Sequence, residues 1–79
     1  MIVKFIKIKC LASKTNDVAD ELVQLTEVRE IYTMPGEFDL LIKCTLTKDT
    51  DIGEFVQKTI QKIPGVNNTF TMDTDVLFI

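Results

Sequence analysis

The sequence predicts an α+β fold of one domain with the element order βαββαβ, and three observations lead to this prediction. Four segments rich in β-branched and aromatic residues surround two segments whose apolar residues recur at helical spacing. The chain has 79 residues, of which 46% are hydrophobic and 27% charged, so we expect a single globular unit over residues 1–79. The two halves of the chain also form an internal repeat, because the constant offset that carries Ile6 onto Cys44 keeps their elements in phase.

The first half begins with a predicted strand over residues 2–10 and a predicted helix over residues 16–26. Within the strand, Ile6 and Ile8 share one face while Phe5 lies on the other, because side chains alternate along a strand. Residues of the types that commonly cap helices precede the helix. The apolar stripe of the helix consists of Val18, Leu22 and Leu25, with Ala19 beside it.

A tight turn is predicted between two further strands, over residues 28–34 and 38–46. Pro35 fixes φ at the second position of this turn, and Gly36 tolerates a positive φ at the third. The two strands are therefore expected to pair as an antiparallel hairpin.

The second helix and the last strand complete the order. Asp51 and Glu54 have the spacing of a capping box at the start of the helix, and Pro64-Gly65 ends it. The final strand begins at Val66. The apolar stripe of this helix consists of Ile52, Phe55, Val56, Ile60 and Ile63.

The internal repeat indicates how these elements are connected in one sheet. The same offset carries Val18 onto Val56, Tyr32 onto Phe70 and Met34 onto Met72. Two split βαβ units that interleave in one antiparallel sheet make the ferredoxin-like fold, with both helices on one face of a four-stranded sheet.

The two faces of the predicted sheet differ less in polarity than is usual for a sheet that has one face in water. The side facing the helices is expected to hold Ile6, Ile8, Cys10, Leu40, Ile42, Cys44, Phe70 and Met72. The opposite side still carries apolar residues, namely Val3, Phe5, Leu41, Leu77 and Ile79. An apolar patch of this kind usually marks an interface, so we expect the chain to dimerise through this face of the sheet.

Composition excludes several functions. The net charge is -3 and there is no basic stripe, which argues against direct binding of nucleic acid. The chain has no His and two Cys without metal-site spacing, so we expect no metal, no cofactor and no enzyme activity, although carboxylate or Lys chemistry stays formally open. Lys4, Lys7 and Lys9 interrupt any signal peptide, and no apolar run could span a membrane. A cytoplasmic location, a solvated edge for these lysines and a buried core role for both cysteines are therefore expected.

Several short motifs occur in a recognisable order. Residues 28–32 (VREIY) lead into residues 36–41 (GEFDLL), and later come residues 63–66 (IPGV) and 69–71 (TFT). This order resembles the effector-binding (RAM) domain of the Lrp/AsnC family of transcription regulators. The family's helix-turn-helix has no room before the first strand, so the chain resembles a stand-alone effector domain without a DNA-binding domain.

The resemblance implies a function and a site. Family domains dimerise through their sheets, and the dimers assemble into rings such as octamers or decamers that bind an amino acid between dimers. Asp39 would accept from the ammonium group, while the amides near Gly36 and the hydroxyls of the threonines would donate to the carboxylate. The positions implied for the ligand are Tyr32, Met34, Gly36, Glu37, Phe38, Asp39, Thr69 and Thr71.

Alternatives stay open at this point. Asp39 could instead serve the backbone of its own turn, and the two threonines are ordinary strand residues. The whole chain could be a structural adaptor that assembles with full-length Lrp/AsnC regulators without binding a ligand. An enzyme of the dimeric ferredoxin-like class fits less well, because the usual His, Arg or Tyr-rich cleft is missing.

Overall fold

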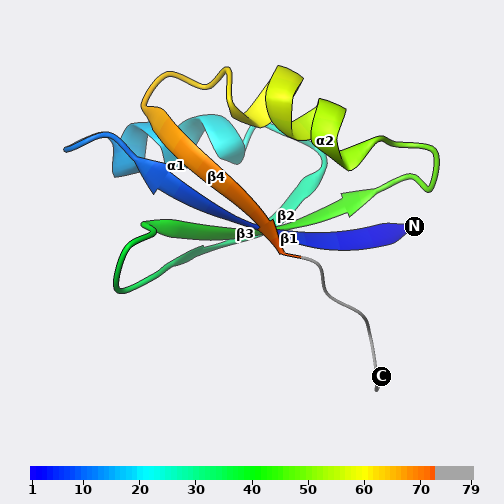
Figure 1. Ribbon diagram of the computed structural model, residues 1–79, viewed down its shortest axis with the longest axis horizontal. Helices are drawn as coiled ribbons and strands as arrows, with labels where there is room; N and C mark the ends of the chain where they lie inside the picture. Colours follow the sequence, from blue (N-terminus) through cyan, green and yellow to red (C-terminus); the bar gives the residue numbers. More distant parts are fainter. Residues whose placement is uncertain (73–79) are drawn as a thin grey trace.

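In the computed structural model, which describes residues 1–72, four strands form one antiparallel sheet and the helical segments cover one of its faces (Figure 1). The strand order is β2-β3-β1-β4, which confirms the predicted ferredoxin-like fold. The elements are β1 (Ile2–Cys10), α1 (Thr15–Leu22), β2 (Val28–Thr33), β3 (Leu40–Leu46), α2 (Ile52–Phe55), η1 (Val56–Ile60) and β4 (Val66–Met72). Leu77 and Ile79, predicted for the dimer interface, lie outside the described residues.

The helical segments are shorter or less regular than their apolar stripes suggest. α1 ends at Leu22, after which the N–H of Leu25 donates to Leu22 O in a tighter turn. The second helix starts as predicted, because the Asp51 side chain accepts from the N–H of Glu54. It then widens into the π-helical η1, where the N–H of Gln61 reaches Val56 O at 2.8 Å.

The core lies between the helices and the sheet face that they cover. Its buried members are Ile6, Ile8, Cys10, Val18, Leu22, Leu40, Ile42, Cys44, Leu46, Phe55, Val56 and Ile60. Both cysteines are buried free thiols, as predicted. Burial raises the pKa of the Cys44 thiol to about 11, with a smaller contribution from the negative charge of Glu27.

Phe70 and Met72 do not belong to this core, so their predicted placement is wrong. Cys10 pairs with Val66 but the preceding Lys9 pairs with Asn68, so one extra residue forms a β-bulge in β4. The bulge reverses the alternation, and Phe70 turns to the face without helices, where 53% of its surface is exposed. We call this face, which the helices leave uncovered, the open face.

A second bulge occurs at the equivalent place in β2. Val28 pairs with Cys44 while Glu30 pairs with Lys43, which leaves Arg29 as the extra residue. The repeat offset carries Arg29 onto the bulge residue Asn67. The repeat therefore extends to the irregularities of the sheet, and Tyr32 joins Phe70 on the open face.

Candidate functional site

The connection between β2 and β3, residues 34–39, is longer than the predicted tight turn, although Gly36 has the predicted positive φ. Gly36 has φ +96°, in the region that side chains rarely adopt, although an added Cβ would meet nothing within 4 Å. The N–H of Met34 donates to Asp39 O at 3.0 Å and closes the turn. Glycine is thus required here by the backbone rather than by a close neighbour.

Asp39 fastens this turn to β1. Its N–H donates to Ile8 O at 2.9 Å, and its Oδ2 accepts from the N–H of Cys10 at 2.7 Å. Because β3 begins only at Leu40, the N–H of Cys10 extends past the end of the neighbouring strand and has no strand partner on that side. The Asp39 side chain therefore binds the backbone of β1 and not that of its own turn. The other oxygen, Oδ1, has no hydrogen-bond partner within residues 1–72.

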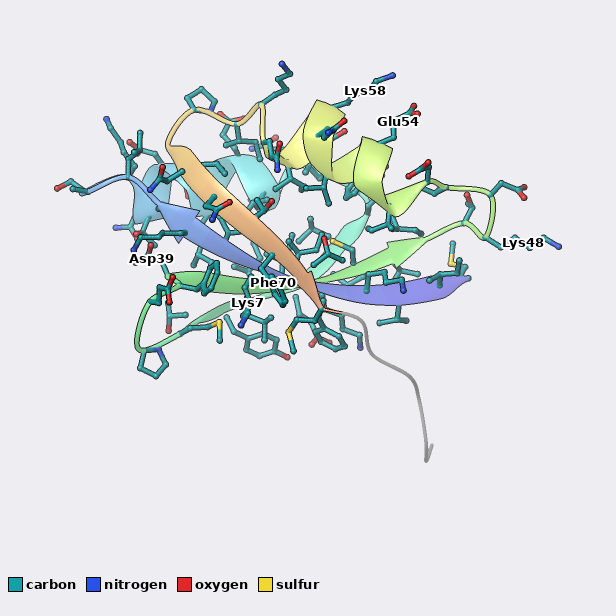
Figure 2. The ribbon with its side chains drawn as sticks, viewed as in Figure 1. Lys7, Asp39, Lys48, Glu54, Lys58 and Phe70 are labelled. Carbon is teal, nitrogen blue, oxygen red and sulfur yellow. The ribbon has the colours of Figure 1, made fainter. Side chains whose placement is uncertain are left out.

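Two lysines of β1 contact the turn from the open face. Lys7 Nζ lies 4.8 Å from the ring centre of Phe38 and 4.9 Å from that of Phe70, so it connects the turn to β4 across β1 (Figure 2). Lys9 Nζ donates to Glu37 O at 2.9 Å. Lys4, Lys7 and Lys9 are all half-buried and β1 is a central strand, so the expectation that they form a solvated edge is wrong. The sequence could not show this contact, since Phe70 reaches the open face only through the bulge.

The two threonines lie on the opposite side of the sheet from these lysines. Thr71 pairs with Ile6 and Thr69 with Ile8, so both face the helices. Thr69 Oγ1 accepts from Gln61 Nε2 at 2.9 Å. β1 separates β4 from the turn, a distance of about 10 Å for two strand spacings. One chain alone therefore does not bring the turn and the threonines together.

Tyr32 belongs to a polar group on the open face. Its hydroxyl donates to the Glu30 carboxylate, which also lies 3.5 Å from Lys43 Nζ. The hydrogen bond from Tyr32 lowers the pKa of Glu30, and the same bond raises the pKa of Tyr32.

The open face carries a larger apolar surface than the sequence suggests. Val3 is 37% exposed and Tyr32 49% exposed, and Phe5, Leu41 and Met72 are half-buried at its surface. The bulges add Tyr32, Phe70 and Met72 to the residues that were expected there.

Two further properties bear on function. Within residues 1–72, no three His, Cys, Asp or Glu side chains lie close enough together to hold a metal ion. None of the helices in this part of the chain has the length and apolar character that crossing a membrane requires.

Comparison with known proteins places these features in context. The family described as the Lrp/AsnC ligand binding domain matches residues 4–72. The HTH-type transcriptional regulator FL11 of Pyrococcus abyssi is 37% identical over 68 residues, which cover 86% of this chain and 44% of that protein. The chain thus spans less than half the length of such curated relatives.

Solved structures give the same picture. The crystal structure of FFRP-DM1 has a TM-score of 0.84 at 33% identity and covers 91% of this chain and 96% of that one. A complex of the transcriptional regulator NMB0573 from Neisseria meningitidis with L-Met has a TM-score of 0.84 at 22% identity, covering 98% and 51% of the two chains. At that identity the second likeness shows the fold alone.

Proposed function

We propose, since this chain belongs to the Lrp/AsnC ligand-binding domain family, that it binds an amino acid and acts as an oligomerising module of transcription control. The family is one of regulatory domains, not of enzymes. The observation that carries the proposal is the match over residues 4–72, which includes the turn at Gly36 and the strand with Thr69. The complex of NMB0573 with L-Met makes L-methionine a suitable first probe.

The first step of this function is dimerisation through the open face. Phe5 and Leu41 lie on the two central strands, and the exposed Phe70 extends the apolar surface to the edge strand. Exposed aromatic and aliphatic side chains that adjoin one another favour association, because their burial removes apolar surface from water. Dimers would then assemble into a ring of four or five, an octamer or a decamer.

The second step is binding between dimers. In one chain the turn and the threonines lie on different sides of β1, so a site that uses both needs two chains. Asp39 Oδ1 has no partner within residues 1–72 and can accept from an ammonium group. The hydroxyl of Thr71 and the amides near Gly36 can donate to a carboxylate. Ligand binding and ring assembly are then thermodynamically linked.

Binding is tested with Asp39→Asn, which is sharper than Asp39→Ala. The amide oxygen of Asn can still accept from the N–H of Cys10, while the negative charge is lost. Calorimetric titration with L-methionine, after a thermal-shift screen of the common amino acids, should show affinity at least tenfold weaker in Asp39→Asn. Thr71→Val should weaken binding more mildly, and Lys48→Gln, beyond the end of β3 and far from Asp39 (Figure 2), should leave it unchanged.

Light scattering during the same titration separates the alternatives. Growth of the ring with ligand supports the linkage. Unchanged affinity in Asp39→Asn, or no amino-acid binding while the ring persists, would favour a structural adaptor that assembles with full-length regulators.

Dimerisation is tested with Phe5→Glu combined with Leu41→Glu. Two charges on the open face should dissociate the dimer and largely unfold the chain, because each protomer would supply half of a shared core. Val23→Glu is the matched control, since Val23 is 64% exposed beyond the end of α1. A folded monomer in the double variant would refute the shared core.

A further inference from the structure

A hollow lies at the end of the sheet opposite the turn, where β2 begins and β3 ends. Its volume is about 320 Å³, at the lower limit of the sizes usual for small-molecule sites. The residues that line it are Met1, Thr26, Glu27, Arg29, Thr45, Leu46, Thr47 and Thr50. This region shares no residue with the turn at Gly36 or with the threonines of β4.

The two halves of the repeat bind their helix exits through equivalent backbone bonds, but in registers that differ by four residues. In the second half, Gly65 O accepts from the N–H of Leu11 at 2.7 Å. The equivalent residue in the first half is Glu27, and its O accepts instead from the N–H of Thr45 at 2.8 Å. Thr45 lies four residues before Asp49, the equivalent of Leu11, so the point at which β3 binds the helix exit is displaced by four residues along the chain. This loop is closed within itself, with 2.8 Å between the hydroxyls of Thr47 and Thr50.

Two residues whose side chains carry opposite charges, Arg29 and Glu27, line this hollow. Arg29 is the single arginine of the chain and occupies the β2 bulge, an irregularity that often redirects a side chain next to a site. Within residues 1–72, the ion pairs involve other residues, so neither Arg29 nor Glu27 has an oppositely charged partner within 4.0 Å. Among the same residues, the Glu27 carboxylate accepts only from the hydroxyl of Thr26, at a long distance of 3.4 Å.

From this arrangement we infer that the hollow is a second small-molecule site, which binds a compact zwitterion such as a free α-amino acid. The guanidinium of Arg29 binds the carboxylate of the ligand, because its planar donors match a carboxylate in bidentate geometry. Glu27 accepts from the ligand ammonium group. The hydroxyls of Thr45, Thr47 and Thr50 can donate or accept and so adapt to either group.

This site differs from the proposed effector site in one essential property. All its residues come from one chain, so its binding does not require ring assembly. Three probes of matched size test its chemistry: L-alanine carries both charges, propionate only the carboxylate, and L-alaninamide only the ammonium group.

The measurement is a heteronuclear NMR titration of the full chain with each probe. We expect L-alanine to shift the amide resonances of residues 26–29 and 45–50, and each single-charge probe to bind at least tenfold more weakly. Arg29→Gln should abolish the binding of propionate and weaken the binding of L-alanine at least tenfold. Glu27→Gln should weaken the binding of L-alanine and of L-alaninamide but leave that of propionate unchanged. Lys62→Gln should change the affinity for none of the three probes.

The result that overturns the inference is also specific. Shifts confined to residues 36–39, or equal affinity for L-alanine in Arg29→Gln and the parent chain, would remove the hollow as a site. If the amide resonances of residues 26–29 shift but ligand binding and ring assembly are not linked, the hollow remains a binding site and the proposed effector site is refuted.

Discussion

The end of the sheet near Asp39 and the end near Arg29 are equivalent under the internal repeat, yet they use their charged groups in opposite ways. At the Asp39 end, the carboxylate binds the backbone of β1 and the Lys9 ammonium binds Glu37 O. At the Arg29 end, Arg29 and Glu27 line a hollow and have no ion-pair partner within residues 1–72.

This contrast begins at a single pair of equivalent residues, Gly65 and Glu27. Gly65 has φ +99°, and an added Cβ would lie 2.9 Å from both Lys14 Cβ and Val18 Cγ2. Glycine thus lets the helix exit lie directly against α1 and accept from Leu11. Glu27 has no positive φ and attaches to β3 instead. The two halves of the repeat can therefore keep the same topology while they differ in function. The charged groups at the Asp39 end bind backbone and stabilise the fold, whereas those at the Arg29 end remain available to bind a ligand.

The largest expected effect comes from altering Gly65. Gly65→Ala places a Cβ against the fully buried Val18 and in a backbone conformation that favours glycine. Clash and backbone strain together should lower the free energy of unfolding by about 2–4 kcal/mol, measured by urea denaturation. Gly36→Ala is the matched control, because it has the strain without the clash and should cost only about 1–2 kcal/mol. Equal losses in the two variants would contradict the role assigned to close packing at Gly65.

Removing the Asp39 carboxylate should have the next largest effect. Asp39→Ala leaves the N–H of Cys10 without its partner beside a buried strand, so we expect a loss of about 1.5–3 kcal/mol in the free energy of unfolding. Asp39→Asn, which keeps an acceptor oxygen, should lose less. Urea denaturation of both variants at neutral pH measures this, and an Asp39→Ala chain as stable as the parent would show that the bond contributes nothing.

The fold could be predicted from the sequence because it depends on features that recur along the chain. Helical spacing around Val18 and Val56 and alternation around Ile6 and Ile42 identify the elements, and the repeat identifies the topology. The family resemblance rests on local motifs such as residues 36–39, in which the structure confirms the positive φ of Gly36.

The remaining features depend on single residues whose geometry leaves no pattern in the sequence. One extra residue at Asn67 moves Phe70 from the core to the open face, and nothing in its side chain signals a bulge. The bond from Cys10 to Asp39 requires β3 to begin at Leu40 and not earlier. The shape at the Arg29 end likewise depends on which N–H donates to Glu27 O. The spacing of residues in the sequence does not show whether this is the N–H of Thr45 or that of a later residue.

The pKa of the Cys44 thiol depends in part on the charge of Glu27, which lies at the Arg29 end of the sheet. Its pKa is raised from 9.0 to about 11, mainly by burial and further by the carboxylate of Glu27. A raised pKa in the folded state favours the neutral thiol, so this contribution to stability is complete below pH 9 and is lost as the pH rises toward about 11. Glu27→Gln should allow the thiolate to form at a slightly lower pH, because the neutral side chain no longer repels it. The loss of stability should therefore level off at a lower pH than in the parent chain.

Urea denaturation between pH 8 and 11 measures this loss, and Cys44→Ala should remove the component that Cys44 contributes. Cys10 serves as an internal comparison at the other end. Burial raises the pKa of its thiol too, but a hydrogen bond from Thr15 works in the opposite direction. A pH profile identical in Glu27→Gln and the parent would mean that the Glu27 charge does not reach Cys44.

The smallest expected effect on stability is the most informative about function. Arg29 and Glu27 make no ion pair within residues 1–72, so Arg29→Gln and Glu27→Gln should each change the free energy of unfolding by no more than about 0.5 kcal/mol without ligand. At saturating L-alanine the parent chain should gain stability by mass action, and both variants should lose most of that gain. Asp39→Asn should behave in the reverse manner, with lower stability in buffer and an undiminished gain from L-alanine at the Arg29 end. Thermal denaturation of the three variants with and without L-alanine measures both quantities in one experiment. If Arg29→Gln unfolds as readily as Asp39→Ala in the absence of ligand, Arg29 is a structural residue and the two ends of the sheet do not differ in the way described.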